Sequence, residues 1–182
     1  LGLEFHPIGG SFESLLASAQ GRRALGIPRS SPFGLGGLYH SFRSCAETVF
    51  RDCWDACHDA EGLVASAVAA PMAELIASRR DLPLVVGLAV PGTPSSEFPH
   101  PGLPPLPLGR LYNRLTYPVA TRLIGRGAAR VFAAWRREAE RLSPGARVSP
   151  RVALLVAVSP VLLPRPSDWP SMAHVTGFWF EQ

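Results

Sequence analysis

Residues 84–90 read Leu-Val-Val-Gly-Leu-Ala-Val, a run without a single polar side chain, and residues 152–158 repeat the pattern as Val-Ala-Leu-Leu-Val-Ala-Val. Continuously apolar strands are typical of parallel sheets whose two faces are both covered. We therefore predict buried strands over 84–90 and 151–158. Both runs are far shorter than the roughly 20 residues that a membrane-spanning helix needs.

Shorter signals of the same kind lie on either side. Leu3–Ile8 alternates weakly between apolar and polar residues and runs into Gly9-Gly10, which predicts a strand and a turn, and Ser11 is placed to cap a helix. Brief apolar runs predict further strands at Gly62–Ala65 and His174–Phe180.

Helical spacing separates these strands. The first predicted helix starts at Tyr39, and its apolar positions are Phe42, Cys45, Val49, Cys53 and Ala56. Pro71 stands where proline is tolerated in a first turn and opens the second helix. Arg110–Arg126 is a third, with apolar positions Leu111, Leu115, Val119 and Leu123, and Val131–Leu142 continues helical. Alternating strands and helices predict an α/β fold, a Rossmann-like parallel sheet flanked by helices.

Two segments are poor in regular structure. Ile27–Leu38 is rich in Gly, Pro and Ser, and seven prolines fall between Val90 and Gly109, where they exclude a helix or a central strand. The second segment follows the carboxyl end of a predicted strand, which is where ligands bind open α/β sheets. His100 lies in it and is the best-placed histidine for a general base, although a structural hydrogen bond is an alternative role.

Composition limits the other possibilities. The chain has 182 residues, enough for one domain, and a net charge of +4, with arginine as its only strong base. Absence of lysine is typical of a GC-rich genome and does not by itself indicate nucleic-acid binding. Three cysteines fit a reducing, cytoplasmic compartment. A solvated face and peripheral contact with anionic lipid are both open for Arg122, Arg126, Arg130, Arg136 and Arg137.

Familiar chemical motifs match poorly. Cys53, Cys57 and His58 are close in sequence, but Cys53 and Cys57 share the helix stripe with Cys45, so we predict core packing and no metal site, with His58 exposed. Gly34-Leu35-Gly36-Gly37 has the wrong spacing for a dinucleotide fingerprint. No nucleophile elbow, phosphate-binding loop ending in Gly-Lys, or His-Glu-x-x-His motif occurs in the sequence.

One string does carry a family resemblance. Pro91-Gly92-Thr93 followed by Phe98-Pro99-His100-Pro101 resembles the loop of sterol glucosyltransferases that reads "PWT....FPHP". Three further segments agree in order: LEFHPIGG near the start, Asp168-Trp169-Pro170, and the ending VTGFWF. The similarity extends over nearly all 182 residues.

The resemblance implies the N-terminal, acceptor-binding half of a GT-B enzyme, with residues 1–182 as one domain truncated at its first strand. The family's catalytic base, in a glycine-rich loop, would then lie upstream of Leu1. The domain that binds a UDP- or dTDP-sugar would lie downstream of Gln182. The implied reaction is an inverting hexosyl transfer to the hydroxyl of an apolar acceptor, sterol- or polyketide-like, and we expect no transfer by this chain alone.

The same resemblance assigns roles to residues. Thr93, Phe98 and His100 would bind the acceptor, while Asp168 and Trp169 would be structural, near an interdomain hinge approached over 160–182. Gly92 replaces the family's tryptophan and removes an apolar wall from the acceptor site. The alternative is a non-catalytic Rossmann-like binding module or a membrane-surface module.

Overall fold

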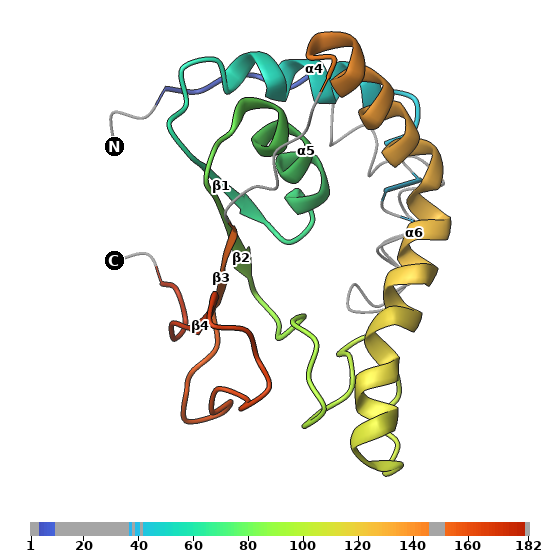
Figure 1. The fold of residues 1–182 in the computed structure, drawn as a ribbon, viewed down its shortest axis with the longest axis vertical. Helices are drawn as coiled ribbons and strands as arrows, with labels where there is room; N and C mark the ends of the chain where they lie inside the picture. The colour runs from blue at the N-terminus through green and yellow to red at the C-terminus, as the bar shows by residue number, and fades with distance from the viewer. Residues whose placement is uncertain (1–3, 10–36, 38, 41, 146–151, 181–182) are drawn as a thin grey trace.

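The computed structural model describes residues 4–9, 37, 39–40, 42–145 and 152–180 (Figure 1). In chain order the elements are α4 (Ala46–Ala56), β1 (Leu63–Ser66), α5 (Ala70–Arg80), β2 (Leu84–Leu88), α6 (Gly109–Leu142), β3 (Val152–Val156) and β4 (Ala173–Val175). Strands and helices alternate, as the apolar runs and the helical spacings predict.

The four strands form one parallel sheet in the order β1-β2-β3-β4. Leu84 pairs with Leu63 on one side and with Val152 on the other, and Leu154 pairs with Ala173. The helices α5 and α6 provide the crossovers into β2 and β3, as parallel neighbours require. This confirms an α/β, Rossmann-like sheet, and it brings the carboxyl ends of all four strands to one edge.

The core has two layers on one side of the sheet. Ala73 and Ala77 of α5 pack against Leu84 and Val86 of β2. Above α5, a second cluster joins it to α4 and α6, and its buried members are Tyr39, Ala46, Phe50, Ile76, Ala128, Val131, Ala134, Trp135 and Ala139. The indole N–H of Trp135 donates to the carbonyl oxygen of Ala46 at 3.0 Å and links the two outer helices.

Helices were expected on both faces of the sheet, but the three that the structure describes all pack on one face. On the other face, Val64 of β1 is 84% exposed. Trp179 lies over the same face at Gly87, where a Cβ atom would come within 2.9 Å of the indole ring. The prediction that β1 is a buried strand is therefore right for its position and wrong for one of its faces.

The predicted strand at Leu3–Ile8 is wrong for the part described. Residues 4–8 form no strand, and Phe5 is exposed because no face of the described core lies against it. The segment is held instead by the amide of Gly9, which donates to the carboxylate of Asp52 at 2.6 Å. Gly10, the helix cap at Ser11 and nearly all of 27–38 lie outside the described residues.

The helix predicted from Tyr39 is interrupted, and its buried face is rotated. Tyr39 and His40 are helical, residues 42–45 form turns, and α4 begins at Ala46; Ala46 and Phe50 are its buried residues, while Ala56 is exposed. The large ring of Phe50 fills the space between α4 and α6 and thereby sets the face.

The two helices predicted within 110–142 form a single helix, α6, of 34 residues that passes through Pro118. Leu111, Leu115 and Val119, which the spacing predicts to face the core, are exposed. Thr116, Tyr117 and Ala120 are buried in their place, because the proline-rich loop packs on that side of the helix. Proline is tolerated in α6 at a solvent-facing position, where water can solvate the carbonyl left without a donor.

The strand ends differ slightly from expectation. β2 stops at Leu88 instead of Val90, and β3 spans most of the predicted 151–158. The last strand is shorter than predicted, since β4 covers Ala173–Val175; beyond it the amides of Thr176 and Gly177 still donate to the carbonyl oxygens of Val156 and Val158, and residues 176–180 are not part of a strand.

Candidate functional site

The loop from residue 89 to residue 108 leaves the carboxyl end of β2 and contains neither helix nor strand, as its prolines predict. It lies between the first half of α6 and the segment that follows β3, at the lower end of the molecule in Figure 1. Contacts with both neighbours fix its shape.

Asp168 holds the loop from the side of the β3–β4 connection. Its carboxylate accepts the hydroxyl of Ser95 at 2.8 Å and the amide of Ser96 at 2.6 Å. The Ser96 amide in particular lowers the pKa of Asp168, because a hydrogen bond donated to a carboxylate favours its charged form. The neighbouring Glu97 reinforces the link by accepting the amide of Ser167 at 3.0 Å.

Side chains of α6 hold the same point from the other side. The guanidinium of Arg110 donates to the hydroxyl oxygen of Ser96 from Nε at 3.2 Å and from Nη2 at 3.0 Å. The side-chain amide of Asn113 donates from Nδ2 to the carbonyl oxygen of Ser96 at 3.0 Å. The Ser95–Ser96 pair is thus the centre of the network. Sequence reasoning missed it, and the only available signal was a pair of small polar residues within a proline-rich run.

Two of the three predicted site residues are packed into the protein. The ring of Phe98 meets Trp169 edge-on with 6.3 Å between centroids, in a cluster with Val156 and Ala173. Thr93 is buried, and its hydroxyl has no hydrogen-bond partner among the described residues; the same holds for the buried indole nitrogen of Trp169. Buried polar atoms without a partner are uncommon in native structures and often mark places where a ligand or water binds.

His100, in the loop, is partly buried against α6. Its backbone amide donates to the Thr116 hydroxyl at 2.8 Å, and its ring lies edge-on to Tyr117 with 5.5 Å between centroids. The Nδ1 atom accepts the amide of Gly102 at 3.0 Å, and burial lowers the pKa of the imidazole. The neutral ring therefore carries its proton on Nε2, so that its free nitrogen is a hydrogen-bond donor and not a base.

Tyr117 connects these groups. Its hydroxyl donates to the carbonyl oxygen of Phe98 at 3.3 Å. Burial, with the nearby Asp168 carboxylate as a second cause, raises the pKa of Tyr117 to about 12. The phenol therefore stays protonated at neutral pH. The structure brings Phe98 and His100 together through Tyr117, whereas the hydroxyl of Thr93 makes no hydrogen bond to any described residue.

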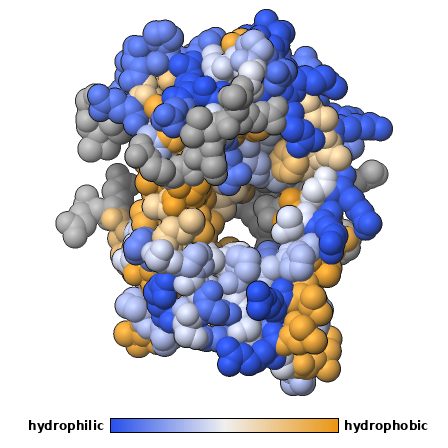
Figure 2. Space-filling view, viewed as in Figure 1, coloured by the Kyte–Doolittle hydropathy of each residue, from blue (hydrophilic) through white to orange (hydrophobic). Residues whose placement is uncertain are grey.

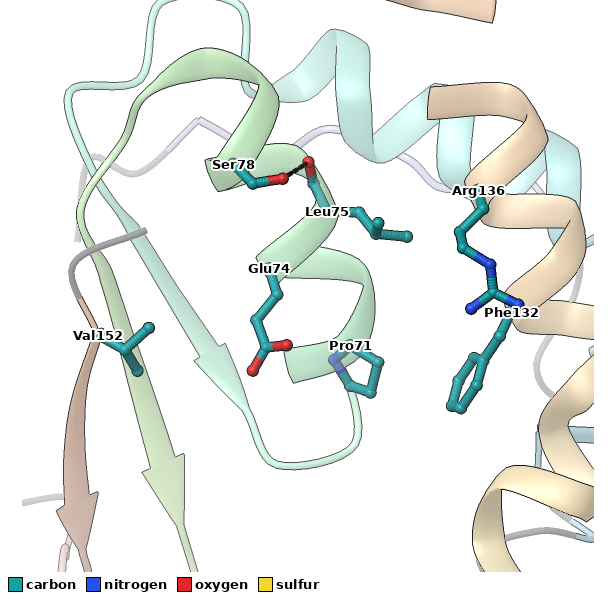
Figure 3. A pocket seen from close by; sticks show the side chains of 7 residues that line it. All are labelled: Pro71, Glu74, Leu75, Ser78, Phe132, Arg136 and Val152. Atoms are coloured by element: carbon teal, nitrogen blue, oxygen red, sulfur yellow. Dashed lines mark hydrogen bonds between the residues drawn. The ribbon is translucent and has the colours of Figure 1, made fainter. Parts of the chain in front are cut away.

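A separate pocket of about 470 Å³ lies between α5 and α6 (Figure 3). Its lining residues are Pro71, Glu74, Leu75, Ser78, Phe132, Arg136 and Val152. Phe132 and Arg136 line it from the side of α6, and burial raises the pKa of the Glu74 carboxyl. None of the residues predicted to bind an acceptor lines this pocket, and the sequence alone did not suggest it.

The cysteines are free thiols. Cys53 and Cys57 pack against the cluster between α4 and α6, which confirms their predicted place at the core, and burial raises the pKa of Cys53 to about 11. His58 is exposed, as expected. Within the described ranges no three His, Cys, Asp or Glu side chains gather as metal ligands would. The glycines at 34 and 36 lie outside those ranges.

Known proteins share sequence with most of the chain, although no protein-family model matches it. It is 30% identical over 149 residues to the sterol 3-beta-glucosyltransferase of Emericella nidulans, covering 76% of this chain and 10% of that protein. The enzyme of the same name from Komagataella phaffii is 27% identical over 189 residues, covering 98% of this chain and 15% of that protein. The chain thus spans only a small part of these relatives.

Proposed function

This chain is related to the sterol 3-beta-glucosyltransferases, a family of GT-B glycosyltransferases, and on that premise we propose that it forms the acceptor-binding part of such an enzyme. The supporting observation is that the string that resembles the family's loop, residues 91–101, is anchored at the carboxyl edge of a parallel sheet, where open α/β folds bind ligands. The reaction would join a hexose from a nucleotide sugar to a sterol hydroxyl.

In that reaction the oxygen of the sterol hydroxyl attacks the anomeric carbon, the bond to the nucleoside diphosphate breaks, and the hydroxyl proton passes to a base. His100 is not placed to act as this base, because its Nδ1 already accepts the amide of Gly102 and its Nε2 carries the proton. We assign His100 a positioning role, in which its Nε2–H donates a hydrogen bond to the oxygen of the sterol hydroxyl. The base and the donor-sugar site would lie outside this chain.

Phe98 and Thr93 have different roles in this proposal. Phe98 supports the loop through Trp169, so that its contribution to the acceptor site is to fix the loop's position. The unpartnered hydroxyl of Thr93 is a second hydrogen-bonding group for a bound molecule. Orientation of a reacting hydroxyl can account for several kcal/mol of barrier lowering, up to roughly 7 to 11 kcal/mol in favourable cases.

The test is saturable binding of a fluorescent sterol to the 182-residue chain, together with an assay for transfer from UDP-glucose. We expect binding without transfer, and His100→Gln should weaken binding by up to about tenfold, the equivalent of one hydrogen bond of roughly 1.4 kcal/mol. His174→Gln is the matched control, because His174 is an exposed histidine on β4.

Absence of saturable sterol binding by the wild-type chain would contradict the acceptor assignment. Glucosyl transfer by this chain alone would contradict the division of roles, since it would require a base and a donor site within it. Equal binding by wild type and His100→Gln would remove His100 from the site and leave the loop assignment standing on Thr93.

A further inference from the structure

The first half of α6 has an exposed apolar face. Leu111, Leu115 and Val119 are 71%, 53% and 44% exposed and recur every four residues, so they form one ridge along the helix. Two exposed leucines of the preceding loop, Leu106 and Leu108, extend the apolar surface past the start of the helix. In Figure 2 this surface is the orange area at the lower right.

The same face becomes basic toward the middle of the helix. Arg122 and Arg126 lie three and seven residues after Val119 and so fall on the same face, and Arg114 lies beside Leu111 at a spacing of three. These three arginines are exposed, and none takes part in an ion pair among the described residues. Residues 98–137 contain seven arginines and no Asp or Glu.

The arginines near the end of α6 are placed differently. Arg137 pairs with Glu47 at 3.1 Å, and Arg136 lines the pocket between α5 and α6. Of the five arginines considered together from the sequence, Arg122 and Arg126 thus lie exposed on the leucine-bearing face, and Arg130 is exposed one turn farther along α6.

We propose that this face, formed by Leu106, Leu108, Leu111, Leu115, Val119 and the arginines 114, 122 and 126, docks on an anionic phospholipid bilayer. Exposed leucines that cost free energy in water are stabilised in the interfacial region of a bilayer. The guanidinium groups beside them match lipid phosphates in charge and in bidentate geometry. Complete absence of carboxylates over this stretch removes the repulsion that an acidic membrane surface would otherwise produce.

Docking would also place the acceptor loop close to the lipid. Thr116 and Tyr117, on the opposite side of the same helical turns, hold His100 and Phe98. A sterol could then pass from the bilayer to the loop over the thickness of one helix. This consequence rests on the proposed function, whereas docking itself does not.

Co-sedimentation with sucrose-loaded vesicles that contain no sterol tests the docking separately from the acceptor site. The chain should partition into phosphatidylcholine vesicles with about one third phosphatidylserine at least about tenfold better than into pure phosphatidylcholine, and about 0.5 M salt should reduce this preference. The double variant Leu111→Ser/Leu115→Ser should lose about tenfold in partitioning to either vesicle, and Arg122→Gln/Arg126→Gln should lose the preference for phosphatidylserine.

Val161→Ser/Leu162→Ser is the matched control, because Val161 and Leu162 are 87% and 72% exposed but have no arginine-rich face beside them. All substituted side chains are exposed, and circular dichroism confirms that each variant is folded. The proposal fails if the wild type ignores phosphatidylserine or if the control loses as much binding as the α6 variants. It fails equally if Leu111→Ser/Leu115→Ser converts a dimer into a monomer with unchanged vesicle binding, since the face would then bind a second copy.

Discussion

At the scale of single residues, the carboxylate of Asp168 is one of the groups that fix the position of the loop over residues 89–108. Asp168 takes hydrogen bonds from two consecutive loop residues that are more than 70 positions away in sequence. The resemblance marked Asp168-Trp169 as structural, and the contacts agree, although they connect the pair to the loop and do not test a role in a hinge. The interaction requires the charged form of the carboxyl, so it predicts a pH dependence.

Asp168→Asn should lower the midpoint of thermal unfolding at neutral pH, because an amide offers one acceptor where two donors point. The pKa of Asp168 is lowered in the folded state, so its stabilising contribution is complete above its ordinary pKa of about 3.9 and disappears as pH falls through the lower folded value. Unfolding midpoints of wild type and variant should therefore differ most near pH 7 and converge below about pH 4.

Asp55→Asn is the control, since Asp55 is exposed on α4 and should give the wild-type curve at every pH. A difference between Asp168→Asn and wild type that stays constant from neutral to acid pH would show that the carboxylate's charge does not hold the loop.

At the scale of elements, helical periodicity located α4, α5 and α6 but misjudged which side of α4 and α6 is buried. A spacing of four along α6 fits two different faces of the helix. Which of the two is buried is decided only by the loop that packs on Thr116 and Tyr117. The loop's own contacts with Asp168 could not be read from the sequence, because they join distant segments. Continuous apolar runs, by contrast, were sufficient for β2 and β3, since few other structures bury such runs.

Phe50 is the residue through which the correct face of α4 can be tested. Its side chain is fully buried between α4 and α6, beside Trp54 in a stacked arrangement with 6.3 Å between ring centroids. Phe50→Ala should lower the free energy of unfolding by about 3 to 5 kcal/mol, through lost burial and a residual cavity. Denaturant titration measures this change.

Val64→Ala, on the exposed side of β1, is the comparison and should change the unfolding free energy by no more than about 0.5 kcal/mol. If Phe50→Ala cost as little as Val64→Ala, the cluster between α4 and α6 would not be the core of the domain.

At the scale of the whole molecule, the chain combines a sheet covered by helices on one face with a C-terminal segment that crosses the other. Strand order follows chain order throughout, and the parallel arrangement was predictable from apolar runs alternating with helices. The path of residues 176–180 across the sheet was not predictable, because the string VTGFWF has the composition of a strand. Gly177 has a φ of 81°, a left-handed conformation suited to glycine, and it follows the end of β4 closely.

Gly87→Ala tests whether this segment lies across the sheet. A methyl group at position 87 would come within 2.9 Å of the Trp179 ring, which must move away. Trp179 is 55% exposed, and its indole N–H donates to Thr176 Oγ1 at 3.0 Å within the same segment, so moving the ring costs little. The loss of packing is partly offset by the lower entropy of the unfolded chain, typically about 0.4 to 1 kcal/mol for Gly→Ala. We therefore expect unfolding free energy to change by less than about 1 kcal/mol while acrylamide quenching of Trp179 fluorescence rises.

Trp179→Phe provides the reference, because the quenching difference should vanish in its background. Unchanged quenching in Gly87→Ala would mean that the segment does not cover Gly87 in solution, and a loss of several kcal/mol would mean that Trp179 is locked in place by contacts stronger than those described.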